Sequence, residues 1–159
     1  MSPFEKVTAY LDERRISYET LQHRRDYTAQ ETAADTHTPG KAFVKTVILV
    51  VDHKYNMFAL PAVEHVDLQK VKTALGAHEV RLAAESEIAH VCRDCEAGAM
   101  PPLGVLYKLP LYASAHLRDD QMITFNAGTH EDAVRMLYRD YETLAHPIVI
   151  DFTSEKARA

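Results

Sequence analysis

Residues 42–51 read AFVKTVILVV, a nearly continuous apolar run interrupted by one lysine, Lys45. Side chains alternate between the two faces of a β-strand, so an apolar run of this kind is apolar on both faces. Such a strand is typical of the middle of a sheet that is covered on both sides. The first face carries Phe43, Lys45, Val47, Leu49 and Val51, and the second carries Val44, Thr46, Ile48 and Val50.

Lys45 has two interpretations within this strand. In the first, its aliphatic stem runs along the core and its ammonium surfaces at an edge, which is the commoner arrangement because buried unpaired lysines are rare. In the second, the ammonium points into a pocket, where it meets an anionic or carbonyl-bearing substrate. The rest of the chain decides between them.

Length and composition favour one compact domain spanning residues 1–159, since 47% of the 159 residues are hydrophobic. The net charge of -5 gives no pervasive basic field, so any nucleic-acid partner needs a local basic patch. No apolar run has the character of a signal peptide or the length of a membrane span, and two cysteines fit a reducing compartment. We therefore expect a cytoplasmic protein with no membrane partner.

Helix caps and hydrophobic periodicity predict a mixture of helices and strands. Ser2, Thr28, Asp67 and Thr129 are expected to cap helices. The order lacks a regular βαβ rhythm, which predicts an α+β domain with a mixed, curled, barrel-like sheet flanked by helices. The expected helices are 3–15, 28–37, 67–75, 84–91 and 129–144, and the expected strands are 16 to about 23, 42–51, 57–60, 80–82, 109–113, 122–126 and 148–152.

Several chemistries are excluded by missing motifs. The chain has no G-x-S-x-G, H-E-x-x-H or Walker sequence, which argues against serine hydrolases, zincins and P-loop proteins. Cys92-Arg93-Asp94-Cys95 is a single C-x-x-C without the second ligand pair of a structural zinc site. We expect neither a metal nor a cofactor.

The loop at residues 98–104, GAMPPLG, combines permissive glycines with stiff prolines. Its prolines have no N–H, which leaves those of Gly98, Ala99, Met100 and Gly104 available. A loop of this kind can present preorganised donors to a carbonyl or oxyanion. The alternative is a structural turn whose glycines only satisfy backbone geometry.

Five segments together resemble the YbaK/ProX family of free-standing editing proteins, which are similar to the editing domain of bacterial prolyl-tRNA synthetase. The resemblance covers about residues 4–152, the expected core of the domain. The segments are TAQETA at 28–33, HTPG at 37–40, KTVIL at 45–49, GAMPPLG at 98–104 and FNAGTH at 125–130.

This resemblance implies the editing-domain fold and hydrolysis, without a cofactor, of the ester that joins a wrong amino acid to tRNA. The implied substrate is Ala- or Cys-tRNA(Pro). The implied partners are the acceptor end of mischarged tRNA and prolyl-tRNA synthetase, with no DNA partner. The alternative is a non-catalytic module of the same fold that binds an aminoacyl or nucleotide ligand or docks on a synthetase.

The resemblance also implies roles for particular residues. Lys45 would hold the terminal nucleotide or the aminoacyl group, Gly98 and Pro102 would shape the loop that receives the carbonyl, and His130 would line the amino-acid pocket. A ribose hydroxyl of the substrate would assist the water, through positioning and electrostatics. Further substrate-binding positions are Thr46, Ala99, Met100, Gly128 and His37, the last with a capping or turn role as its alternative.

Two features depart from this pattern. Many relatives carry an aspartate where this chain has Ser114, which bears on the shape of the pocket and on specificity. The acidic net charge also leaves few cations for tRNA phosphates, so we expect weak, salt-sensitive binding. The cations nominated to hold the acceptor end are Lys41, Arg24, Arg25 and Arg135.

Overall fold

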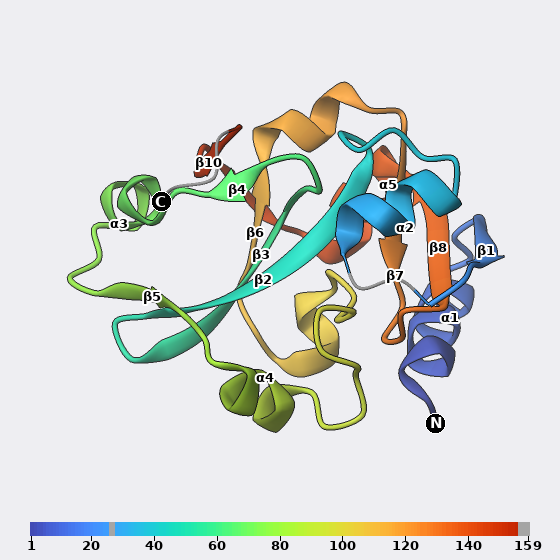
Figure 1. Cartoon of the computed structure of the whole chain (residues 1–159), viewed down its shortest axis with the longest axis horizontal. Coiled ribbons are helices and arrows are strands. Elements are labelled where there is room, and N and C mark those ends of the chain that lie inside the picture. The colour runs from blue at the N-terminus through green and yellow to red at the C-terminus, as the bar shows by residue number, and fades with distance from the viewer. Residues whose placement is uncertain (26–27, 156–159) are drawn as a thin grey trace.

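The computed structural model describes residues 1–25 and 28–155. Within these residues, helices and strands are mixed along the chain, as the sequence predicts (Figure 1). The helices are α1 (Pro3–Glu13), α2 (Ala29–Asp35), α3 (Leu68–Leu75), α4 (Glu85–Val91) and α5 (Tyr138–Ala145), with short 3₁₀ helices η1 (Gly104–Tyr107) and η2 (Ala115–Asp119). The strands are β1 (Tyr18–Gln22), β2 (Phe43–Val51), β3 (Lys54–Pro61), β4 (His65–Val66), β5 (Val80–Leu82), β6 (Leu111–Ser114), β7 (Met122–Asn126), β8 (Asp132–Leu137), β9 (Ile148–Ile150) and β10 (Thr153–Ser154).

The main sheet is mixed and places β2 at its centre. Its order is β1-β8-β7-β2-β3-β6-β9, and β5 adds to the far end of β2. The pairs β2–β7, β3–β6 and β6–β9 are parallel, and the others are antiparallel. The α+β prediction with a mixed sheet is confirmed, although the sheet is open, because β1 and β9 are its two ends. The strands β4 and β10 form a separate small sheet.

Helix caps follow the predicted chemistry at three helices. The hydroxyl of Ser2 accepts the N–H of Glu5 at 3.1 Å, and the hydroxyl of Thr28 accepts that of Glu31 at 3.1 Å. Asp67 caps α3 in the same way, and Gly76 ends that helix with a φ of 61°. These contacts fix where α1, α2 and α3 begin, because they satisfy N–H groups that lack a partner within the helix.

The two faces of the sheet bury separate apolar clusters, which explains why β2 is apolar on both faces. The larger cluster unites one face of the sheet with α1, α5 and the loop at residues 98–104; its members include Val44, Ile48, Leu11, Tyr141 and Leu103. On the other face, Leu49, Phe58, Leu60, Val71 and Phe152 form a second cluster, and Phe43 packs with Ala33 and Ala62 in a third. Lys45 therefore shares its face with the two smaller clusters.

The predicted helix at residues 129–144 is wrong in its first half. Residues 132–137 form β8, which pairs with β7 on one edge and with β1 on the other, and the helix α5 begins only at Tyr138. Ala133, Val134 and Met136 are buried in this strand. Its two long-range pairings outweigh the helical spacing of Val134, Leu137 and Tyr141, which is local.

Cys92 and Cys95 form a disulfide, so the reduced thiols expected of a reducing compartment are not what the structure contains. The disulfide lies between α4 and the loop at residues 98–104. In the described part of the chain, no helix has the length and apolar character needed to cross a membrane.

Candidate functional site

The candidate site lies where two parallel strands separate. β2 pairs with β7 only at Phe43 and Val44, and with β5 only from Leu49 onward. Between these pairings the edge of β2 from Lys45 to Ile48, which we call the β2 notch, has no strand partner among the described residues. Crevices of this kind, where neighbouring parallel strands diverge, are common binding sites in sheets.

The loop at residues 98–104 lies beside the β2 notch. A cavity of about 230 Å³ is lined by Thr46, Val47 and Ile48 of β2 and by Gly98 and Met100 of this loop. Leu82, Ala83 and Ile88 complete its largely apolar wall. The hydroxyl of Thr46 is buried and has no hydrogen-bond partner in the described part of the chain. It is the one polar side-chain group that this wall offers to a ligand.

His130 is held against the same loop. Its Nε2 lies 2.5 Å from the carbonyl oxygen of Ala97, and its ring lies 3.6 Å from the position of a Cβ added at Gly98. Its backbone N–H donates to Oε2 of Glu96 at 3.3 Å, and the N–H of Glu96 donates to the carbonyl of Gly128 at 2.8 Å. The structure thus brings His130, Gly128 and the start of the loop into one hydrogen-bonded unit.

The backbone donors of the loop are only partly those expected. The N–H of Ala99 donates to the carbonyl of Glu96 at 3.0 Å, so the sequence-based expectation that it is available is wrong. Within residues 1–25 and 28–155, the N–H groups of Gly98, Met100 and Gly104 have no hydrogen-bond partner. Gly98 is exposed and has a φ of 81°, so it presents the most accessible of these three donors.

Pro102 and Gly128 are both buried, and both help to set the backbone shape around the loop at residues 98–104 and His130. Pro102 is buried, and its carbonyl accepts the hydroxyl of Tyr141 at 2.7 Å, which ties the loop to α5. Complete burial of Tyr141 raises the pKa of its phenol far above the ordinary value, so the hydroxyl stays a donor. Gly128 is buried beside Pro3 at the start of α1 and has a φ of 97°.

Lys45 lies on the β2 notch with its side chain on the opposite face from Thr46. Its Nζ donates to the carbonyl of Ala62 at 3.4 Å, and the amide of Gln30 from α2 lies at 3.4 Å from the same oxygen. Burial lowers the pKa of the Lys45 ammonium, and the nearby carboxylate of Glu64 acts in the opposite direction. Lys45 is therefore neither a fully exposed snorkelling residue nor an unpaired buried charge.

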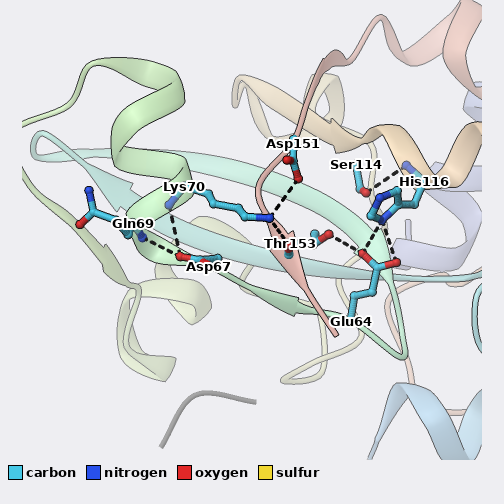
Figure 2. A network of polar contacts seen from close by, with 8 residues as sticks. All are labelled: Glu64, Asp67, Gln69, Lys70, Ser114, His116, Asp151 and Thr153. Carbon is cyan, nitrogen blue, oxygen red and sulfur yellow. Dashed lines mark hydrogen bonds and ion pairs between the residues drawn. The ribbon is translucent and has the colours of Figure 1, made fainter. Parts of the chain in front are cut away.

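The carboxylate of Glu64 and the residues that hold it were not among the predicted site residues. Figure 2 shows the side chain of Glu64 between His116 of η2 and Thr153 of β10. Nδ1 of His116 lies 2.8 and 2.9 Å from the two carboxylate oxygens, and the hydroxyl of Thr153 donates to one of them. The signal in the sequence was a glutamate directly after the apolar segment 57–63, but its partners come from segments about 50 and 90 residues away.

The hydrogen bond that caps η2 at Ser114 and the turn that contains His37 do not involve the β2 notch. Ser114 is buried at the end of β6, and its hydroxyl accepts the N–H of His116 at 3.2 Å, which caps η2. His37 is exposed in the turn after α2 with a φ of 54°, and no described hydrogen bond joins its ring to the other candidate residues. Its placement matches the turn role that the sequence left as the alternative.

Most of the cations nominated for tRNA are already engaged. Arg24 pairs with Asp35 at 2.7 Å, and Arg25 pairs with Glu96 at 2.9 Å. Arg135 is half-buried and donates to Thr124, Thr36 and Thr38, so it is part of the scaffold. Lys41 forms no ion pair within 4 Å among the described residues, and it borders a cavity beside Glu64.

A larger cavity lies elsewhere. It measures about 640 Å³ and lies at the far end of β2, beside Val50, His53 and Lys72. Two of its charged residues, Arg81 and Glu87, pair with each other at 2.7 Å. None of the candidate residues lines it, so volume alone does not identify the site.

Comparisons with known proteins identify the family of this chain. Residues 23–144 match the family model described as an aminoacyl-tRNA editing domain. The chain is 30% identical over 105 residues to a proline–tRNA ligase of Staphylococcus epidermidis, which covers 66% of this chain and 18% of the ligase. It is 33% identical over 95 residues to the multifunctional Ser/Thr-tRNA deacylase ProXp-y of Escherichia coli K12, covering 58% of this chain and 56% of that protein.

Solved structures show the same fold at low sequence identity. One, described as a candidate trans-editing enzyme for prolyl-tRNA synthetase, superposes with a TM-score of 0.83 at 21% identity over 97% of this chain and 98% of that chain. Another, a hypothetical protein, gives a TM-score of 0.84 at 19% identity over 94% of this chain and 99% of that chain. The chain spans only about half the length of the deacylase and less than a fifth of the ligase. Since the family model matches most of its length, this chain belongs to the aminoacyl-tRNA editing domain family.

Proposed function

We propose that this protein is a trans-editing aminoacyl-tRNA deacylase, which hydrolyses the ester between a wrong amino acid and the 3′ end of tRNA. The observation that carries the proposal is the β2 notch itself. On one side of this edge lie Thr46 and the free N–H of Gly98, and on the other lies the half-buried ammonium of Lys45. An ester that crosses the edge would meet both sides.

The reaction needs a water molecule, a place for developing negative charge and a fixed substrate. Water attacks the ester carbonyl, the bond to the ribose oxygen breaks, and the products are a free amino acid and tRNA. The N–H groups of Gly98 and Met100 would donate to the carbonyl oxygen as it becomes an oxyanion. The ammonium of Lys45 would hold the terminal nucleotide or the aminoacyl group, and a ribose hydroxyl of the substrate would assist the water.

The small cavity beside Thr46 supports a small amino acid as the group removed. Its walls are mostly apolar, and its volume of about 230 Å³ suits alanine or cysteine carried on tRNA(Pro). The unpartnered hydroxyl of Thr46 is also a suitable partner for a hydroxylated side chain, and one relative is a Ser/Thr-tRNA deacylase. We propose Ala- and Cys-tRNA(Pro) as the first substrates, with His130 limiting the pocket.

Recognition of tRNA would use the acceptor end alone. Of the four nominated cations, Lys41 is the one without an ion pair within 4 Å in the described part of the chain, so binding should be weak and sensitive to salt. A partner such as prolyl-tRNA synthetase would then supply specificity for tRNA(Pro). We propose residues 4–152 as one editing unit for this task.

The test is deacylation of Ala-, Cys-, Ser-, Thr- and Pro-tRNA(Pro) by the wild type, by Lys45→Ala and by Lys54→Ala. Lys54 is an exposed lysine at the start of β3 and serves as the matched control. We expect the wild type and Lys54→Ala to release a wrong amino acid and spare proline, and Lys45→Ala to lose about 100-fold or more in kcat/KM. Release of no amino acid above the buffer rate by the wild type would overturn the deacylase proposal and favour a binding module.

A further inference from the structure

Glu64 is a buried carboxylate held from two sides. It is only 7% exposed and lies just after β3, in the turn that Ala62 begins. Its two oxygens lie 2.8 and 2.9 Å from Nδ1 of His116, and one of them also accepts the hydroxyl of Thr153 (Figure 2). A carboxylate with this many hydrogen-bond partners is fixed in place.

The same turn holds Lys45. The register of the β2–β3 pair sets Lys45 opposite Leu60, and the chain after β3 folds back so that the N–H of Ala62 donates to the carbonyl of Phe43 at 2.8 Å. The carbonyl of Ala62 accepts Nζ of Lys45 at 3.4 Å. Glu64 follows two residues later on the same side of the sheet, since its partner Thr153 adjoins Phe152 of the cluster on that face.

We propose that Glu64 is a positioning residue for the editing site. It is fixed by His116 and Thr153 in the turn whose Ala62 carbonyl accepts Nζ of Lys45, and from there it acts as the counter-charge near the Lys45 ammonium, although no ion pair within 4 Å joins the two in the described part of the chain. This inference rests on the proposed function, in which the Lys45 ammonium must be charged to hold the substrate. A half-buried ammonium without a counter-charge would tend to lose its proton. The electrostatics of Lys45 support a counter-charge role for Glu64. Burial lowers the pKa of Lys45, and the carboxylate of Glu64 acts in the opposite direction and raises it.

Other charges surround this pair without replacing it. Lys41, His116, Asp119 and Glu155 border, with Glu64, a cavity of about 490 Å³. Asp119 and Asp151 act on His116, whose pKa is raised chiefly by its hydrogen bond to Glu64. Among the described residues, Glu64 is the charged group whose field acts on Lys45, so changes at Glu155 should leave the pKa of Lys45 unaffected.

The test measures the pKa of Lys45 directly, by NMR titration of ¹⁵N-labelled lysine side chains in the full chain, with the Lys45 signal assigned from Lys45→Arg. Wild type, Glu64→Gln, Glu64→Asp and Glu155→Gln are compared. We expect the pKa of Lys45 to fall in Glu64→Gln, to remain closer to wild type in Glu64→Asp and to be unchanged in Glu155→Gln. On mischarged tRNA, Glu64→Gln should lose about three- to tenfold in kcat/KM at alkaline pH and less near neutrality.

Failure of this inference and failure of the proposed function give different results. An unchanged pKa of Lys45 in Glu64→Gln overturns this inference whether or not the protein deacylates tRNA. A wild type that is inactive on every ester overturns the proposed function, even if the pKa of Lys45 falls as expected. If Glu64→Gln does not fold, the comparison passes to Glu64→Asp, whose shorter side chain draws the carboxylate away from its present position and should lower the pKa of Lys45 by a smaller amount; no change there overturns the inference as well.

Discussion

Gly128 packs directly against Pro3, so the turn that carries His130 rests on the first residue of α1. A Cβ atom added at Gly128 would overlap the ring of Pro3, and the backbone of Gly128 has a φ of 97°. Both facts require glycine at this position. This apolar contact is one of the links between the N-terminal helix and the candidate site, beside the shared apolar cluster.

Gly128→Ala should destabilise the fold through both strain and overlap. We expect a loss of about 2–4 kcal/mol in the free energy of unfolding, measured by urea denaturation. Gly76→Ala is the control, because Gly76 also has a positive φ, of 61°, but a Cβ there meets nothing within 4 Å. That variant should lose only about 1 kcal/mol. Equal losses in the two variants would show that the contact with Pro3 contributes nothing.

Glu96→Ala should impair activity more than stability. Glu96 accepts the backbone N–H of His130 and pairs with Arg25, so its removal frees the turn to move against the loop. We expect kcat/KM on mischarged tRNA to fall by about tenfold. Glu131→Ala is the control, since Glu131 faces Arg25 at 3.8 Å but does not hold the N–H of His130. The prediction fails if both variants lose activity equally.

Tyr141→Phe should loosen the loop at residues 98–104. The change leaves the buried carbonyl of Pro102 without its donor, which should cost about 1–3 kcal/mol of stability and slow deacylation. Tyr10→Phe removes a comparable bond, from its hydroxyl to the carbonyl of Leu144 at 3.2 Å, at a less buried position away from the loop. We expect this control to keep wild-type activity. Equal activity of Tyr141→Phe and Tyr10→Phe would contradict a role for this bond in shaping the loop.

Stability should depend on pH through His116. The carboxylate of Glu64 raises the pKa of His116 in the folded state above its unfolded value of about 6.5. The stabilisation is therefore fully present below about pH 6.5 and is lost as pH rises through the raised folded pKa. Half of the ring is exposed, so we expect no more than about 1 kcal/mol.

The measurement compares wild type and His116→Asn by thermal unfolding between about pH 5.5 and 9. The difference in stability should be greatest at the acid end and shrink toward pH 9. His90→Asn, at an exposed position near the end of α4, is the control and should show little dependence. A difference that grows with pH would have the wrong sign for this ion pair.

Much of the fold follows from short-range patterns, and the exceptions have a clear cause. The caps at Ser2, Thr28 and Asp67 and the apolar run of β2 each lie within about ten residues, so sequence alone predicts them. The strand β8 could not be predicted in this way, because the apolar residues of segment 132–137 have helical spacing and the segment becomes a strand only through pairing with β7 and β1. Partners more than a hundred residues away, as in the β1–β8 pair, leave no local signal.

The residues of the candidate site also fall into those that local sequence predicts and those that it does not. Lys45 stood out because a charge interrupts an apolar strand, and the loop at residues 98–104 because of its glycines and prolines. Glu64 did not, since a single glutamate near a turn is unremarkable until His116 and Thr153 are seen to hold it. The hydrogen bond from the N–H of Ala99 to the carbonyl of Glu96 could not be predicted either, because it depends on the path of the loop.

The unpaired edge of β2 has a consequence for how the selectivity of such a domain can change. An edge that lacks a strand partner from Lys45 to Ile48 offers main-chain groups, apart from the carbonyl of Ile48, which accepts the N–H of Ala83 at 3.0 Å. Main-chain groups are the same whatever the side chains. Replacement of Thr46, Met100 or Leu82 alters the size and polarity of the neighbouring cavity without removing that edge. In the proposed reaction, the place where an ester docks and the choice of amino acid would thus be carried by different parts of the molecule, so substitution could exchange one wrong amino acid for another while hydrolysis continues.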